Sequence, residues 1–171
     1  MTLSRLQSGI GVLVFTAACS PAVGDLRLGC AYELASGQSS IVQYVSGVTT
    51  GPPTGNRPLL VAARHEFEQI TVDLAQSRNL VRLIVYAFSE SGRVLNWGGT
   101  LVASTYGGDR VELPLDRPPS NETGVLLSLY NVDGELTLRA EMEEFRGTVR
   151  DAVNAYGFDR ITWLDGRSPL T

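Results

Sequence analysis

Hydrophobic and polar residues alternate along most of this chain, which is the pattern of β-strands with one buried face. The alternation is clearest in residues 69–74, 110–115 and 136–143. In the last segment leucine, alanine and methionine share one face of the predicted strand, whereas threonine, arginine and glutamate occupy the other. Several such strands joined by short turns predict a mainly all-β fold, specifically a two-sheet antiparallel β-sandwich.

Two further segments add detail to the predicted sandwich. Residues 80–88 form a nearly continuous apolar run broken by Arg82, as expected for a central strand that is covered on both faces. Residues 125–131 lead into Asp133-Gly134, and Asp-Gly is a strong signal for a tight hairpin turn. We therefore expect this strand to pair with the alternating strand that follows it.

One short helix is predicted near the C-terminus. Thr148 and Asp151 have the spacing of a capping box, and Gly157 suits the position after the last helical residue. The apolar residues between them follow helical spacing, namely Val149, Ala152, Val153 and Tyr156. We expect this stripe to pack on an end or a face of the sandwich.

Composition fits one domain spanning residues 1–171, because 43% hydrophobic residues suffice for a full core. The net charge of −4 provides no basic surface for nucleic acid. With His65 as the one histidine and only two cysteines, the chain lacks the usual parts of catalytic triads and zinc sites. No nucleophile–base pair is visible, so we predict that the protein is not an enzyme.

The N-terminal segment allows two interpretations. Residues 10–18 follow Arg5 and are largely apolar, and Thr16 to Cys19 resembles a lipoprotein cleavage box in which Cys19 would carry the lipid. Residues 12–16 are also a normal β-branched and aromatic strand, and cleavage would remove that strand from the sandwich. We favour the strand, with free and partly buried thiols, and keep the lipid-anchored extracytoplasmic binding module as the alternative. No segment is long enough to span a bilayer.

Residues 25–34, Asp-Leu-Arg-Leu-Gly-Cys-Ala-Tyr-Glu-Leu, closely resemble a decamer of the TerD-type tellurium-resistance and stress-response family, in particular its TerA-like branch. Further short matches keep the family's order along the chain: Gly55-Asn56-Arg57, residues 66–74, Asn96-Trp97 and residues 155–158. The resemblance implies a TerD-like sandwich and a bacterial stress-response role.

The resemblance also implies a calcium site, because calcium takes carboxylate and carbonyl oxygens from neighbouring loops. The matching positions are Asp25, Asn56, Glu66 and Glu68. Arg27 stands where the family has a second aspartate, and a guanidinium has no lone pair to offer a metal. We expect Arg27 to pair with Asp25 or Glu66, and the calcium loop to be degenerate, with at most weak calcium binding and no other cofactor.

The loop that follows this region also departs from the family. Residues 57–65 contain no carboxylate, and residues 59–61 are predicted to form an edge strand. Residues 46–57 are expected to lack regular structure because of their glycine and proline content. His65 lacks the helical spacing of a zinc motif and is expected at the surface.

Three other candidates have simpler structural explanations. Glu141, Glu143 and Glu144 could form a carboxylate active site but lie on the polar face of an alternating strand. Cys30 could be a reactive thiol but fits a small core position. Trp97, expected in a hairpin, would mark a partner surface if exposed and would plug the sandwich if buried; we favour the buried position.

The resemblance implies a non-catalytic scaffold or interaction module for resistance to tellurite and other chemical stress. The implied partners are other tellurium-resistance proteins or a stress complex near the membrane. The implied location is cytoplasmic, with membrane association through partners.

Overall fold

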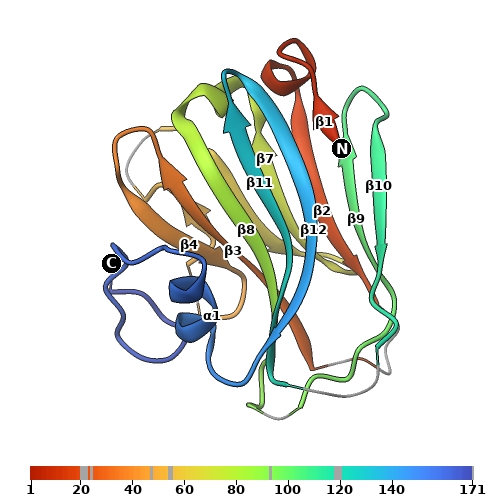
Figure 1. Cartoon of the computed structure of the whole chain (residues 1–171), viewed down its shortest axis with the longest axis vertical. Coiled ribbons are helices and arrows are strands. Elements are labelled where there is room, and N and C mark those ends of the chain that lie inside the picture. The colour runs from red at the N-terminus through yellow and green to blue at the C-terminus, as the bar shows by residue number, and fades with distance from the viewer. Residues whose placement is uncertain are drawn as a thin grey trace.

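The computed structural model describes residues 1–19, 23, 25–46, 48–53, 56–92, 94–117 and 121–170. They form two six-stranded antiparallel sheets packed face to face (Figure 1). The first sheet has the spatial order β1 (Thr2–Leu3), β12 (Glu135–Phe145), β11 (Thr123–Val132), β8 (Leu80–Ser89), β3 (Leu26–Leu34) and β4 (Ser39–Gln43). The second has the order β10 (Arg110–Pro114), β9 (Thr100–Thr105), β2 (Val12–Ala18), β7 (Glu68–Asp73), β6 (Leu60–Arg64) and β5 (Thr50–Gly51). The predicted two-sheet antiparallel sandwich is confirmed.

Strand β8 lies in the middle of the first sheet and is covered on both faces. Leu83, Val85 and Ala87 face the core between the sheets. Ile84 and Phe88 belong to a second apolar cluster on the outer face of the same sheet. The continuous apolar run of residues 80–88 therefore arises because both faces of β8 are buried, as predicted.

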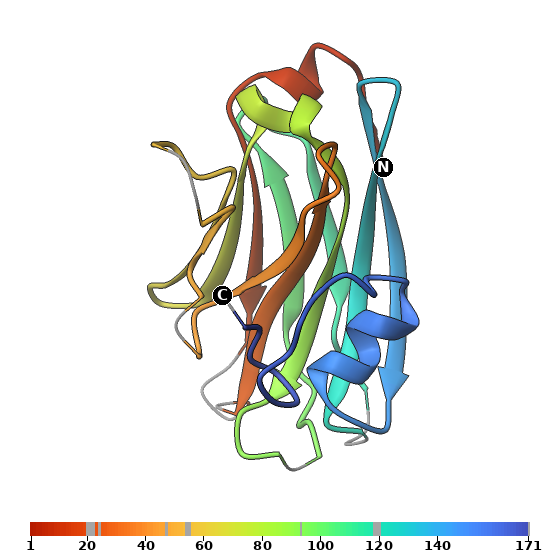
Figure 2. The same ribbon diagram turned by 90° about the vertical axis from the view of Figure 1, so that its left-hand side faces the viewer.

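The second cluster exists because the helix α1 (Val149–Ala155) packs on the outer face of the first sheet (Figures 1 and 2). Val149, Ala152 and Val153 are buried there. Thr148 and Asp151 form the predicted capping box, with each side chain accepting a hydrogen bond from the backbone of the other. Gly157 follows with a positive φ of 81°, which glycine adopts without strain. Two 3₁₀ segments, η1 (Gln7–Gly9) and η3 (Leu74–Asn79), complete the described elements.

Strand β2 pairs with β7 on one side and β9 on the other. Leu13 and Phe15 have no exposed surface and Ala17 is 5% exposed. Residues 12–16 therefore lie in a strand, as expected. Cleavage before Cys19 would take this buried strand out of the middle of the second sheet and leave the core open.

Three local expectations are corrected. Asn96-Trp97 does not lie in a hairpin, because residues 90–99 connect β8 in one sheet to β9 in the other. Residues 59–61 are not an edge strand, since β6 pairs with both β7 and β5. Strand β5 also gives residues 46–57 a short piece of sheet. As expected, Trp97 is buried, with 8% of its surface exposed.

The alternation along β12 fails near its end. Leu136 and Leu138 are buried, but Ala140 is exposed and Met142 has a positive φ of 51°. Between Val125 and Leu127 of β11 the pairing shifts, because β12 advances three residues, from Ala140 to Glu143, while β11 advances two. The alternation of hydrophobic and polar residues along one strand contains no information about such a shift in pairing.

Candidate functional site

A pocket of about 650 Å³ opens at the end of the sandwich where β2 ends and β3 begins. Its lining comes from both sheets and from the turn between β6 and β7, and consists of Ala17, Ala18, Cys19, Val23, Leu26, Arg27, Arg64, Glu66, Phe67 and Glu68. The volume is in the range typical of small-molecule sites. Four charged side chains stand beside a largely apolar wall, so the pocket can contact both kinds of ligand group.

Glu68 is the deepest charged group of this pocket, with 7% of its side chain exposed. Its Oε2 accepts a hydrogen bond from the backbone N–H of Leu28 at 3.3 Å. Its Oε1 is buried and has no hydrogen-bond partner among the described residues. Burial raises the pKa of this carboxyl, and the neighbouring charges of Arg64 and Arg27 only partly oppose that shift.

The hydrogen bond from Leu28 follows from the strand register. Strand β4 ends at Gln43, which is paired with Gly29 of β3. Leu28 therefore lies one residue beyond the last β4 partner, and its N–H would have no sheet acceptor on that side. Glu68 of the second sheet supplies the acceptor, because unpaired buried backbone groups are costly.

The two arginines of the pocket are held differently. Arg27 donates from Nε to Glu90 at 2.7 Å and from its guanidinium to the carbonyl of Leu26 at 3.1 Å. Arg64 lies across the β6–β7 turn from Glu68, with 3.8 Å between the guanidinium and Oε2. The Arg64 guanidinium also stands over the ring of Tyr44, 5.4 Å from its centre.

Asp25 is engaged at the end of β8. Its carboxylate accepts hydrogen bonds from the Ser89 hydroxyl, the Ser91 hydroxyl at 2.8 Å and the Ser91 N–H at 3.0 Å. Burial acts to raise the pKa of Asp25, but these bonds and the charge of Arg27 outweigh it and lower that pKa. The expected pairing of Arg27 with Asp25 or Glu66 is wrong, because its ion-pair partner is Glu90 at 2.6 Å.

The four predicted calcium ligands are thus distributed over different surroundings. Glu66 and Glu68 line the pocket, whereas Asp25 is tied to the two serines of the β8 end. Asn56 is exposed in the loop between β5 and β6, and the neighbouring Gly55 lies outside the described residues. Within the described part of the chain, no three histidine, cysteine, aspartate or glutamate side chains are grouped so that they could hold a metal ion.

Both cysteines are free, as expected. Cys30 is fully buried in the core, and burial raises its pKa, so it is a packing residue. Cys19 is half-buried at the pocket wall, where burial and then the charge of Glu68 raise its pKa to about 11. A thiol in this state is a poor nucleophile at neutral pH.

The carboxylates of β12 bind neighbouring side chains. Glu141 accepts a hydrogen bond from the Ser128 hydroxyl at 2.6 Å, and Glu143 accepts one from the Tyr156 hydroxyl at 2.7 Å. The interaction of Tyr156 with these glutamates adds to the effect of burial and raises the pKa of the phenol. His65 is exposed, as expected.

Sequence reasoning missed the inward position of Glu68, although a signal was present. Glu68, Ile70 and Val72 share one face of β7 by their spacing of two residues, and all three are buried. It also missed Arg64, which faces Glu68 across the turn, and Phe67 in the pocket wall. The Arg-x-x-x-Glu spacing of Arg64 and Glu68 was the available signal.

Comparison with known proteins identifies the fold. No protein-family model matches the chain, and no curated protein sequence matches it significantly. Solved structures similar to it include the following two. A protein of unknown function, SAV2460, is 17% identical with a TM-score of 0.58, covering 81% of this chain and 91% of that one. A homologue of the telluride resistance protein TerD, SCO6318 from Streptomyces coelicolor A3(2), is 14% identical with a TM-score of 0.57, covering 80% and 91%. The chain therefore has a TerD-like fold, as its motifs predicted.

Proposed function

We propose that this protein is a non-catalytic interaction module of the tellurite and chemical stress response. The TerD-like fold supports this role, since the similar Streptomyces coelicolor structure is described as a homologue of a telluride resistance protein. The motif order along residues 25–34, 66–74 and 155–158 points in the same direction. Its partners would be other tellurium-resistance proteins or a stress complex near the membrane.

The site chemistry is consistent with binding rather than with catalysis. The pocket at the end of the sandwich contains a buried carboxylate and two arginines, and its thiol has a raised pKa. A nucleophilic thiol needs a lowered pKa instead. Calcium would meet only Glu66 and Glu68 in this pocket, with the fixed charges of Arg27 and Arg64 opposing it. We therefore propose weak calcium binding at most.

Lipid anchoring through Cys19 is the alternative that the N-terminal segment allows, but the burial of β2 argues against it. Among the described residues, no helix combines the length and the apolar character that crossing a bilayer requires. We propose that residues 12–18 stay in the mature protein. Intact-mass measurement should find them, and a diacylated Cys19 at the N-terminus would contradict the proposal.

Deletion of the gene in its native host tests the stress role. We expect the minimal inhibitory concentration of tellurite to fall, and the wild-type gene to restore it. A matched gene encoding Phe15→Asp should fail to restore tolerance, because a charge at this fully buried position prevents folding. Unchanged tolerance to tellurite and to other chemical stress after deletion would refute the proposed function.

A further inference from the structure

The pocket at the end of the sandwich contains an incompletely satisfied carboxylate. Glu68 is buried and uses Oε2 for the N–H of Leu28, while Oε1 has no donor in the described part of the chain. Leaving a buried polar atom without a partner is unfavourable, and more so for a charged group. A ligand that brings a hydrogen-bond donor, and best a cationic one, would satisfy this oxygen once the Glu68 carboxylate rotates toward the pocket, because Oε1 has almost no accessible surface in the free protein.

Arg64 supplies the complementary group. Its side chain is 36% exposed, and its guanidinium donates no hydrogen bond to a described residue. At 3.8 Å from Glu68 Oε2 it is an ion-pair neighbour but too distant to hydrogen-bond. A carboxylate is the preferred partner of a planar guanidinium because two parallel bonds form. Arg27 has less to offer, since Glu90 and the carbonyl of Leu26 already engage it.

The remaining wall is apolar. Ala17, Val23 and Leu26 are buried at the pocket, and Phe67 lines it from the turn. An aliphatic group placed against these residues would lose its contact with water, which is favourable in proportion to the buried area.

The charges of the wall favour a ligand with both signs. Two glutamates and two arginines line the pocket, so a simple cation is opposed by the arginines and a simple anion by the glutamates. We propose that the pocket binds a small α-amino acid with an aliphatic side chain. Its ammonium group would contact the Glu68 carboxylate, its carboxylate Arg64, and its side chain the apolar wall. The short distance between Arg64 and Glu68 requires the two ligand charges to be close together, as they are in an α-amino acid.

Binding by the purified full-length chain tests this inference independently of the stress role. L-leucine is the probe, measured by isothermal titration and by thermal shift at millimolar concentration. Three analogues of leucine test its charged groups separately. The amine 3-methylbutylamine lacks the carboxylate, 4-methylpentanoate lacks the ammonium group, and the isomer 6-aminohexanoate carries both charges far apart. We expect each to bind about tenfold more weakly than leucine, or worse.

Variants assign the contacts. Glu68→Gln can still accept the Leu28 N–H but loses its charge, and it should weaken leucine binding about tenfold or more while the ligand-free protein stays folded. Arg64→Leu should weaken binding similarly. The matched controls are Glu135→Gln and Arg110→Leu, at exposed positions on β12 and β10, and both should bind like the wild type.

Three results would overturn the inference. They are the absence of leucine binding at millimolar concentration, binding of 6-aminohexanoate or calcium as tight as that of leucine, and unchanged affinity in folded Glu68→Gln. A negative result here leaves the stress phenotype intact, because that phenotype is measured in cells without reference to this ligand.

Discussion

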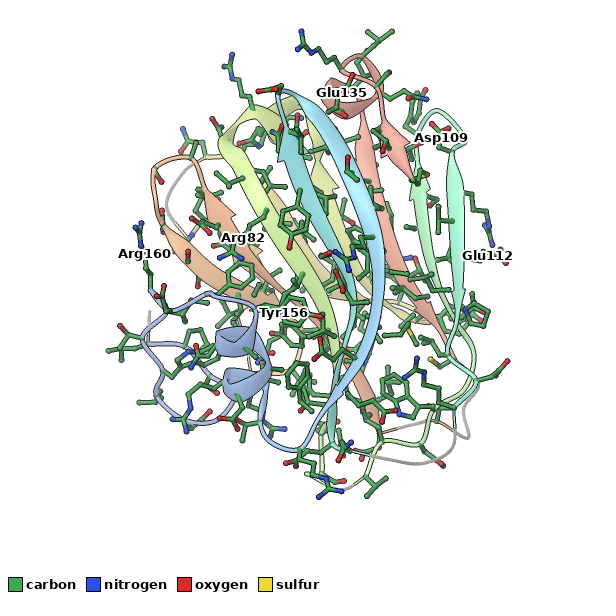
Figure 3. All side chains as sticks on the ribbon, in the orientation of Figure 1. Arg82, Asp109, Glu112, Glu135, Tyr156 and Arg160 are labelled. Atoms are coloured by element: carbon green, nitrogen blue, oxygen red, sulfur yellow. The ribbon has the colours of Figure 1, made fainter. Side chains whose placement is uncertain are left out.

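Arg82 connects the sandwich to the C-terminal helix, and its removal should loosen that helix. The side chain leaves the outer face of β8 toward α1, where it lies near Tyr156 (Figure 3). Its Nε donates to Glu33 of β3 at 2.7 Å. The two terminal nitrogens donate to the carbonyls of Tyr156 at 2.7 Å and of Gly157 at 2.9 Å, just past the last turn of α1. The guanidinium also stands 4.2 Å from the centre of the Phe158 ring.

These contacts set the expected size of the effect. The ion pair is partly exposed, with 22% of Arg82 and 26% of Glu33 accessible, so it contributes less than a buried pair. Charged hydrogen bonds to two carbonyls contribute about 1 kcal/mol each after this discount. The cation over Phe158 adds about 0.5–1 kcal/mol. We expect Arg82→Leu to lower the free energy of unfolding by about 3 kcal/mol, which for a chain of this size is a fall in Tm of about 6–12 °C.

The assay is chemical and thermal unfolding of Arg82→Leu beside Arg110→Leu. Arg110 forms a similarly short ion pair with Glu112 at 2.6 Å, but 58% and 54% of the two side chains are accessible. Figure 3 shows Glu112 on the edge strand β10. Loss of this ion pair should cost less than about 1 kcal/mol. Arg82→Lys keeps the charge without the planar fork and should fall between wild type and Arg82→Leu. Equal losses of unfolding free energy in Arg82→Leu and Arg110→Leu would refute the reasoning, because the contacts at the end of α1 would then add nothing to the ion pair.

Three further predictions concern single groups. Burial raises the pKa of Glu68 above its usual 4.5, so the folded chain holds this proton more tightly than the unfolded chain does. The resulting loss of folding stability is absent below pH 4.5 and grows as pH rises through the pKa of the folded state. Glu68→Gln should thus be more stable than wild type in urea near neutral pH and lose that advantage in acid, and an advantage independent of pH would contradict the shift. Cys19, with its pKa raised from 9.0 to about 11, should react with iodoacetamide roughly 100-fold more slowly than a free cysteine at neutral pH, and faster in Glu68→Gln; labelling at the free rate would disprove this. Thr148→Ala removes half of the capping box and should cost about 1 kcal/mol in denaturant melts, whereas the exposed Thr2→Ala should change little.

Local patterns predicted the parts of the fold that local forces determine. The run of residues 80–88 indicated a strand covered on both faces, and Thr148 with Asp151 indicated where α1 begins. In both cases the information lies within a few residues of the feature. The shift in pairing between β11 and β12 and the position of Met142 were not predictable, because they depend on how two strands are registered against each other.

The candidate site was predicted only in part, for the same reason. Of the four residues that the motifs singled out, Glu66 and Glu68 line the pocket, but the predicted partner of Arg27 was wrong. Strand register aligns Leu26 with Ser89 and Arg27 with Phe88, so Arg27 reaches diagonally across the pair to Glu90, while Ser89 and Ser91 engage Asp25. The contacts of Arg82 with the end of α1 join residues more than 70 positions apart, as the separation of 74 to Tyr156 shows. No spacing rule covers such distances.

The two oxygens of Glu68 link the architecture of this end of the sandwich to its binding chemistry. Because β4 stops at Gln43, the N–H of Leu28 needs an acceptor from the opposite sheet, and Oε2 provides it. A neutral amide could do the same with a smaller desolvation cost, so structural support alone does not require a carboxylate here. The negative charge of Glu68 is favourable only if a cationic group contacts Oε1. The described residues offer only Arg64, whose guanidinium lies 3.8 Å from the other oxygen, Oε2. We therefore expect Glu68→Gln to gain stability near neutral pH and to lose ligand affinity. Both changes have the same cause, the unpaired oxygen of Glu68.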